Sequence, residues 1–160
     1  MRKSRGFSLI ELLIVVAIIL VLAAIAIPSL MRSRISANEA SAVASLRSIN
    51  TAQVTYIVTY PSEGYSDTLT KLAMPVGTAP VSSTSAGLID WVLGCSAQPC
   101  PKSGYNFAIT GTSGTPIVVY SLTAVPTVPG TTGFSGFCSD QLSHVTYDPA
   151  GGTSCTLPLQ

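Results

Sequence analysis

The order of apolar and polar positions divides the first third of the chain at Met31. From Phe7 to Leu30 almost every residue is apolar, and Glu11 is the one ionisable side chain in the run. From Met31 to Tyr60 apolar residues recur at three- and four-residue steps, with arginines and a glutamate between them. The first pattern is typical of a helix that crosses a bilayer, which needs about 20 apolar residues. The second predicts an amphipathic helix, so we expect one long helix over residues 7–60.

Beyond Pro61 the pattern changes to short runs separated by Gly, Pro, Ser and Thr. Asp67–Met74 predicts a short helix, whereas Gly87–Leu93 fits either a helical turn or a strand. β-branched and aromatic residues bounded by turn signals predict short strands, here Tyr105–Thr110, Ile117–Val125, His144–Tyr147 and a fourth near Phe134–Cys138. Short strands with tight connections favour an antiparallel sheet packed on the second half of the long helix. The predicted fold class is therefore α+β.

Charge is scarce in this chain and unevenly placed. Charged residues make up 9% of the sequence, against roughly 25% in ordinary soluble proteins. Arg2, Lys3 and Arg5 precede the apolar run, so the positive-inside rule leaves residues 1–6 in the cytoplasm and sends the rest outward. The net charge is +1 and no basic cluster occurs outside this leader, so we expect no specific nucleic-acid partner.

Three interpretations of the apolar run compete. It is a secretory signal peptide cut near Ala24–Ala26, a permanent single-pass anchor, or a segment whose leader is cut on the cytoplasmic side. Glu11 separates them, because a carboxylate inside a membrane helix costs about 2.5–3.5 kcal/mol on insertion scales and marks a functional site by default. A disposable signal or a plain anchor has no use for that cost. The acid therefore favours the third interpretation.

The segment Arg5-Gly6-Phe7-Ser8-Leu9-Ile10-Glu11-Leu12-Leu13 resembles the processing motif of type IV prepilins. In that family a Gly precedes the scissile bond, an apolar residue becomes the new N-terminus, and a Glu follows shortly afterwards. The match covers only the first tenth of the chain. Looser similarity to the C-terminal domain of some bacterial type IV pilins extends over Lys102–Phe107, Tyr120–Pro126 and Phe137–Pro149.

The resemblance implies a domain organisation. Residues 1–6 are a leader that prepilin peptidase removes, and residues 7–30 are the transmembrane and filament-core helix. Residues 31–60 continue this helix into a globular domain, residues 61–160, that carries the antiparallel sheet and a disulfide-bounded region. We also expect a kink at Pro28, because proline removes one backbone donor and crowds the preceding turn.

The resemblance also implies the site residues and partners. The chain is cut between Gly6 and Phe7, and Phe7 is N-methylated by the same peptidase/methylase. Glu11 then neutralises the Phe7 amine of a neighbouring copy, which sets the register of a homopolymeric helical filament. The precursor is expected in the bacterial inner membrane together with the pilus assembly machinery, and the product in an extracellular pilus.

All four cysteines, Cys95, Cys100, Cys138 and Cys155, lie in the C-terminal part of the chain. An even number of cysteines in a small exported domain predicts two disulfides. Their spacing fits no common zinc pattern, so no metal site is expected. Four cysteines permit three connectivities. Proximity gives Cys95–Cys100 and Cys138–Cys155, and the second bond would close a loop like the one found in many pilins.

No catalytic or cofactor-binding constellation is predicted, so the chain is not expected to be an enzyme. His144 with Asp140 and Asp148 imitates a hydrolase triad, but nothing like a nucleophile elbow surrounds the serines. The glycine-rich turns lack the lysine and the following helix of a phosphate loop. Asp140 and Asp148 are too few for calcium, which takes six to eight oxygens.

The function implied by the resemblance is that of a structural pilus subunit, with roles in adhesion, twitching motility and DNA uptake. A pseudopilin of a type II secretion system is the first alternative. A single-pass anchored binding domain outside the cytoplasm, whose leader imitates a prepilin, is the second. The sequence leaves open whether the subunit is major or minor.

Overall fold

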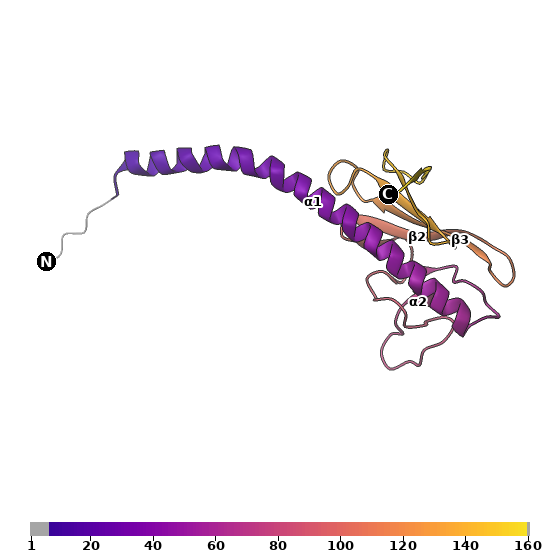
Figure 1. The fold of residues 1–160 in the computed structure, drawn as a ribbon. Coiled ribbons are helices and arrows are strands. Elements are labelled where there is room, and N and C mark those ends of the chain that lie inside the picture. Colours follow the sequence, from indigo (N-terminus) through magenta and orange to yellow (C-terminus); the bar gives the residue numbers. More distant parts are fainter. Residues whose placement is uncertain (1–6, 160) are drawn as a thin grey trace. The chain divides into compact units, whose positions relative to one another are not determined.

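The computed structural model describes residues 7–159, which fall into two compact units; the first ends at Arg34 and the second begins at Ile35. Helix α1 spans Leu9–Thr59 and contributes to both units (Figure 1). It starts two residues later and ends one residue earlier than the predicted range 7–60. Pro28 lies inside α1, so the backbone stays helical on both sides of it. The leader, with Gly6, lies outside the described residues.

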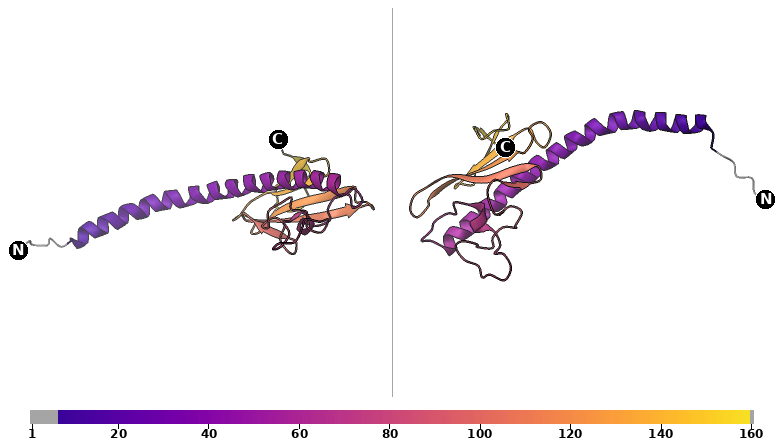
Figure 2. Two further views of the ribbon diagram at one scale, coloured as in Figure 1. Left: turned by 90° about the horizontal axis from the view of Figure 1, so that it is seen from below. Right: turned by 180° about the vertical axis from the view of Figure 1, so that it is seen from behind.

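The second unit holds one six-stranded sheet with the strand order β1-β2-β3-β4-β5-β6, and every neighbouring pair is antiparallel. The sheet is a meander because each strand pairs with the next one along the chain. Figure 2 shows the C-terminal part of α1 lying over one face of this sheet. The strands are β1 Cys100–Lys102, β2 Tyr105–Ser113, β3 Val119–Pro126, β4 Gly136–Asp140, β5 Val145–Asp148 and β6 Leu157–Pro158.

The predicted fold class, a long helix against a small antiparallel sheet, is confirmed, and the differences concern element ends. Ile117 does not begin β3 but forms an isolated parallel bridge with Gly64. Helix α2, Leu69–Leu72, is shorter than predicted. Residues 87–93 form neither a helix nor a strand, and Ile89 instead bridges Ala73. Strands β1 and β6 were not predicted, because each is only two or three residues long and contains a proline.

The core lies between α1 and the sheet. The buried positions of α1 follow helical spacing and include Ala42, Leu46, Ile49 and Tyr56. Alternate residues of β2 and β3 point at them, as expected for strands with one buried face, namely Tyr105, Phe107, Ile109, Tyr120, Leu122 and Ala124. The three- and four-residue apolar steps in the sequence are therefore the core-facing stripe of α1.

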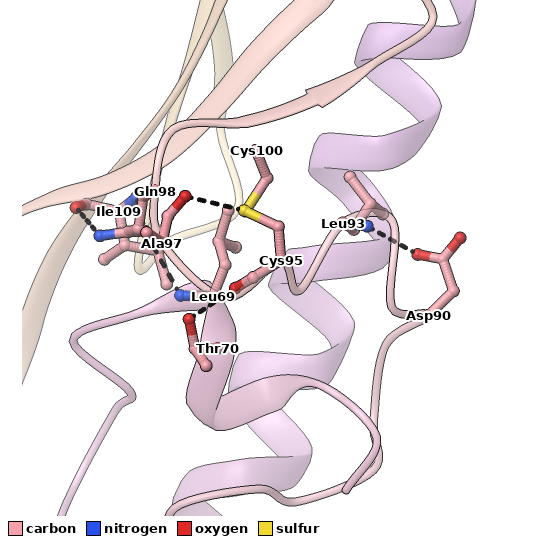
Figure 3. The surroundings of a disulfide bond; sticks show 9 residues. All are labelled: Leu69, Thr70, Asp90, Leu93, Cys95, Ala97, Gln98, Cys100 and Ile109. Atoms are coloured by element: carbon pink, nitrogen blue, oxygen red, sulfur yellow. Dashed lines mark hydrogen bonds between the residues drawn. A yellow bond between two sulfur atoms is a disulfide. The ribbon is translucent and has the colours of Figure 1, made fainter. Parts of the chain in front are cut away.

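The second unit contains two disulfides. Cys95 bonds Cys100, and Cys138 bonds Cys155, which are the pairs given by proximity in the sequence. Figure 3 shows the first bond beside the Gln98 side chain. The Gln98 Oε1 accepts the backbone N–H of Leu69 at 3.3 Å and that of Ile109 at 2.9 Å. This short loop therefore links α2 to β2.

Candidate assembly segment

Residues 7–31, here called the assembly segment, present apolar side chains to their surroundings along the whole length of the segment. Its exposed large apolar residues are Phe7, Leu9, Ile10, Leu12, Leu13, Ile14, Val15, Val16, Ile18, Ile19, Leu20, Val21, Leu22, Ile25, Ile27, Leu30 and Met31. An 18-residue window in α1 has a mean hydropathy of 3.2 and none of it is buried. By length and composition, α1 is the one helix of the described chain able to cross a membrane. These side chains require lipid or other chains around them.

Glu11 is the only charged side chain of the assembly segment and stands exposed in the first turn of α1. A carboxylate at a helix N-terminus is favoured by the helix dipole. Within residues 7–159 no lysine, arginine or histidine lies within 4.0 Å of it, since both salt bridges of that range join other residues. In an apolar environment an unpaired carboxylate is costly, and the described residues place no cation beside Glu11.

Three of the predicted site residues, Phe7, Glu11 and Pro28, lie in the described part of the assembly segment. Phe7 precedes the helix and is 80% exposed, and Glu11 follows it by four residues. Among residues 7–159 no salt bridge involves Glu11. Cleavage, N-methylation, the pairing of Glu11 with a neighbour's amine and the kink at Pro28 stay predictions. The disulfide partners, by contrast, are brought together in the second unit.

Glu39 is a residue whose role sequence reasoning missed. Its Oε1 accepts the backbone N–H of Phe134 at 2.9 Å and that of Ser135 at 3.1 Å. The neighbouring Asn38 donates from Nδ2 to the carbonyl oxygen of Thr132 at 2.8 Å. These bonds fasten the connection between β3 and β4 to α1. The sequence carries no local signal for them, because the partners are more than 90 residues apart.

A buried polar network joins α1 to the middle of the sheet. The Asn50 Nδ2 donates to Ser139 Oγ at 2.7 Å, and the Tyr120 hydroxyl donates to Asn50 Oδ1 at 3.0 Å. Buried polar groups need such partners because an unsatisfied one costs about 1–3 kcal/mol. Desolvation by burial is the main cause that raises the pKa of Tyr120 well above its usual value. These groups fix how α1 sits on the sheet.

Asp140 and Asp148, the acids near His144 in the sequence, accept backbone hydrogen bonds that stabilise turns. The Asp140 Oδ1 accepts the backbone N–H of Leu142 at 3.0 Å and that of His144 at 3.3 Å. The Asp148 oxygens accept the N–H groups of Ala150 and Ser154. It is thus the main-chain nitrogen of His144, and not its ring, that Asp140 engages. Among residues 7–159 no group of three His, Cys, Asp or Glu side chains lies placed to hold a metal ion.

Comparisons with known proteins address the N-terminal segment directly. Residues 1–27 match the family described as the prokaryotic N-terminal methylation motif. The type IV major pilin protein PilA of Myxococcus xanthus (strain DK1622) is 41% identical over 78 residues, which is 49% of this chain and 33% of that protein. These matches support the interpretation of the chain as a type IV pilin.

A second pilus protein is similar over a shorter stretch. The type IV wide pilus major component PilA4 of Thermus thermophilus is 59% identical over 39 residues, 24% of this chain and 30% of that protein. The aligned part therefore spans about a third of each curated relative. No solved structure matches. The pilin assignment rests on the N-terminal motif and these two relatives, together with a fold of the predicted class.

Proposed function

We propose that the chain is a structural subunit of a type IV pilus, polymerised through α1 into an extracellular filament. One observation carries the proposal. An exposed apolar helix contains a single carboxylate without a partner among the described residues, and both lie in a segment that matches the methylation motif. The named relatives are major components of such pili. A filament core supplies both the apolar surroundings and the cation that this segment lacks within its own described chain.

Assembly follows from the chemistry of the segment. Cleavage after Gly6 creates a free amine on Phe7, and N-methylation leaves its positive charge in place. In a bundle of helices an unpaired Glu11 is costly and a paired one is tolerated. Pairing Glu11 with the Phe7 amine of a neighbour therefore fixes the register of each subunit in the filament. It also favours transfer of the subunit from the lipid into the filament. Before cleavage the same helix holds the precursor in the inner membrane, where the peptidase and the assembly machinery act on it.

The second unit is the surface domain of this subunit. Its sheet, its two disulfides and its Ser/Thr-rich loops suit an exported compartment. A type II secretion pseudopilin would share the same N-terminal segment, but the named relatives are pilus components. Roles in adhesion, twitching motility and DNA uptake stay predictions of the family resemblance.

Substitution at the cleavage site tests the proposal against a plain membrane anchor. Gly6→Val, which blocks a peptidase that needs a side-chain-free residue there, is compared with Ser4→Val in the same leader. We expect filaments in the sheared surface fraction from Ser4→Val and none from Gly6→Val, with uncut precursor retained in the membrane. Equal amounts of surface filaments from the two variants would overturn the proposal. The proposal would also be overturned if both variants left equal amounts of chain in the membrane and neither formed filaments.

A further inference from the structure

The short loop before β1 continues the pairing of β1 with β2 through a side chain. Strand β1 pairs Cys100 with Phe107 in an antiparallel register, and the same register, carried two residues further, places Gln98 opposite Ile109. There the Gln98 Oε1 accepts the Ile109 N–H at 2.9 Å, and the Gln98 Nε2 donates to the Ile109 carbonyl oxygen at 3.2 Å. A strand residue at a hydrogen-bonded position makes the same two bonds through its own peptide groups.

A primary amide is well suited to replace a strand residue in this way, because it carries both a donor and an acceptor. Ile109 is 4% exposed, and leaving its peptide groups buried without partners would be costly. The orientation of the amide follows from its neighbours. Its Oε1 faces two backbone N–H groups, whereas its Nε2 faces a carbonyl oxygen. Gln98 therefore closes the edge of β2 just beyond the end of β1.

The same amide reaches α2. Its Oε1 also accepts the backbone N–H of Leu69, the first residue of α2, at 3.3 Å (Figure 3). The hydroxyl of the next residue, Thr70, donates to the carbonyl oxygen of Cys95 at 2.7 Å. Residues 69–95, here called the α2 segment, are thus joined near their two ends, and Gln98 fastens them to the edge of β2.

The Cys95–Cys100 bond restricts where Gln98 can lie. Cys100 belongs to β1 and is completely buried, so the bond ties Cys95 to the sheet across a sequence separation of 5. Without the bond the loop between the two cysteines gains conformations in which Gln98 no longer faces Ile109. The bond therefore favours the contacts of Gln98 by limiting the freedom of the loop.

We propose that the Cys95–Cys100 bond and the Gln98 amide form one redox-sensitive clamp that holds the α2 segment against the edge of β2. A dithiol opens the clamp by thiol–disulfide exchange. The dithiol gives two electrons and two protons to the bond, which becomes two cysteine thiols, while the sulfurs of the dithiol join in a disulfide of their own. The contacts of Gln98 are then formed for less of the time, and the α2 segment opens more often by local unfolding.

Opening of the α2 segment has a consequence for the subunit, because this segment contributes to the core. Leu69, Leu72 and Leu93 are buried members of the core cluster, and they are uncovered when the segment opens. A reduced chain is therefore expected to offer more apolar surface and more cleavable backbone than an oxidised one. The inference concerns the second unit alone and does not depend on the proposed function.

Hydrogen exchange of the full chain in detergent micelles, resolved to single amides by electron-transfer fragmentation, tests the clamp. Gln98→Met keeps the length of the side chain and removes the amide, and Gln141→Met makes the same change in the connection between β4 and β5. In Gln98→Met the N–H groups of Leu69 and Ile109 should exchange about tenfold faster, as expected for the loss of one hydrogen bond. In Gln141→Met both rates should stay unchanged.

The strand itself provides an internal control. Peptide groups of an antiparallel strand point alternately to its two sides, so the N–H groups of Ala108 and Thr110 face β3 when that of Ile109 faces Gln98. In Gln98→Met these two rates should stay unchanged. Equal acceleration of all three amides would indicate general unfolding of the sheet and would contradict the clamp.

A chain that keeps only one disulfide tests the redox step. Paired Cys138→Ser and Cys155→Ser changes remove the other bond and should leave the exchange of Leu69 and Ile109 unchanged. Dithiothreitol, a dithiol, should then accelerate the exchange of both amides in this chain. Adding Gln98→Met to the same chain should abolish the response to dithiothreitol, because the bond acts through Gln98 and the two effects are coupled.

Three results would overturn the proposal. The first is an unchanged rate at Ile109 in Gln98→Met, and the second is full protection of Leu69 and Ile109 after reduction. The third is a response to dithiothreitol that persists in the absence of the Gln98 amide. If Gln98→Met does not fold, Gln98→Asn replaces it, because this change keeps the amide but shortens the side chain by one methylene group. The same two amides must then exchange faster, and unchanged rates would equally refute the clamp.

Discussion

The two halves of α1 differ in the exposure of their apolar side chains, although they belong to one helix. Up to Met31 every large apolar side chain is exposed and the single charge has no partner in the described chain. After Ile35 the apolar residues alternate with polar ones, and those that face the sheet are buried. Leu20 is 63% exposed, whereas Leu46 is 0% exposed. The second half is covered by its own chain, whereas the first half is exposed within the described residues, as the proposed function requires of a surface that lipid or other copies cover.

This difference explains why the candidate site cannot be recognised as a pocket. A binding site for a small molecule is concave and largely formed before its ligand arrives. The assembly segment is an exposed apolar surface with one carboxylate, and under the proposed function its partner is an equivalent surface on another copy. The proposed function would supply what residues 7–159 do not place around this segment, namely lipid or protein around its side chains and a cation beside Glu11.

The largest expected effect is the loss of filaments on removing the charge of Glu11. Glu11→Gln keeps the size of the side chain but leaves the Phe7 amine of the neighbour unpaired, and breaking a buried pair costs about 3–5 kcal/mol. The yield of sheared filaments, measured by immunoblot, should fall at least about a hundredfold. The control is Glu63→Gln, which neutralises an exposed acid of the second unit and should leave the yield unchanged. Similar yields from both variants would contradict the account.

The next largest effect is a difference in the free energy of unfolding between substitutions in the two halves of α1. Leu46→Ala creates a cavity in the core and should lower the free energy of unfolding by about 2–5 kcal/mol. Leu20→Ala changes a side chain that contacts little in its own chain, so the unfolding of the sheet should stay within about 0.5 kcal/mol of the unchanged protein. Thermal unfolding of the full chain in detergent, followed by circular dichroism, measures both. Equal destabilisation would show that the first half is packed by its own chain.

Loss of a disulfide should have a graded effect on the second unit. By the chain-entropy model the Cys138–Cys155 bond, with a separation of 17 residues, contributes about 3 kcal/mol, and the Cys95–Cys100 bond, with a separation of 5, contributes about 2 kcal/mol. Paired Cys→Ser changes at each bond, tested by denaturant unfolding, should follow this order. A larger effect from the shorter loop would mean that contacts around Gln98, rather than loop entropy, dominate.

The smallest effect is a loss of stability at high pH. Burial is the main cause that raises the pKa of Tyr56 from 10.0 to about 12, and Glu63 adds to the rise. The folded state therefore holds this proton more tightly than the unfolded state. The resulting stability is full below pH 10 and is lost as the pH rises from about 10 towards 12. Melting temperatures across this range should fall less steeply for Tyr56→Phe than for the unchanged chain, and parallel slopes would refute the assignment.

Residues that act with near neighbours were predictable from the sequence. The periodicity of Leu46, Ile49 and Tyr56 is local, so the helix and its buried stripe could be predicted. The cysteine pairs lie 5 and 17 residues apart, so proximity sufficed. The role of Glu39 depends on a loop 95 residues away, and no periodic pattern encodes that distance. Strands β1 and β6 escaped prediction because their prolines oppose strand propensity and only pairing with β2 and β5 stabilises them.

The central claim is that the assembly segment begins at Phe7 and is completed by other copies. Intact and N-terminal peptide mass spectrometry of protein sheared from cell surfaces tests it most directly. The account predicts a chain that begins at Phe7, carries one added methyl group and is four hydrogens lighter than its fully reduced form. A surface chain that still begins at Met1, or one that begins after Ala26, would contradict it and leave an anchored or freely secreted domain.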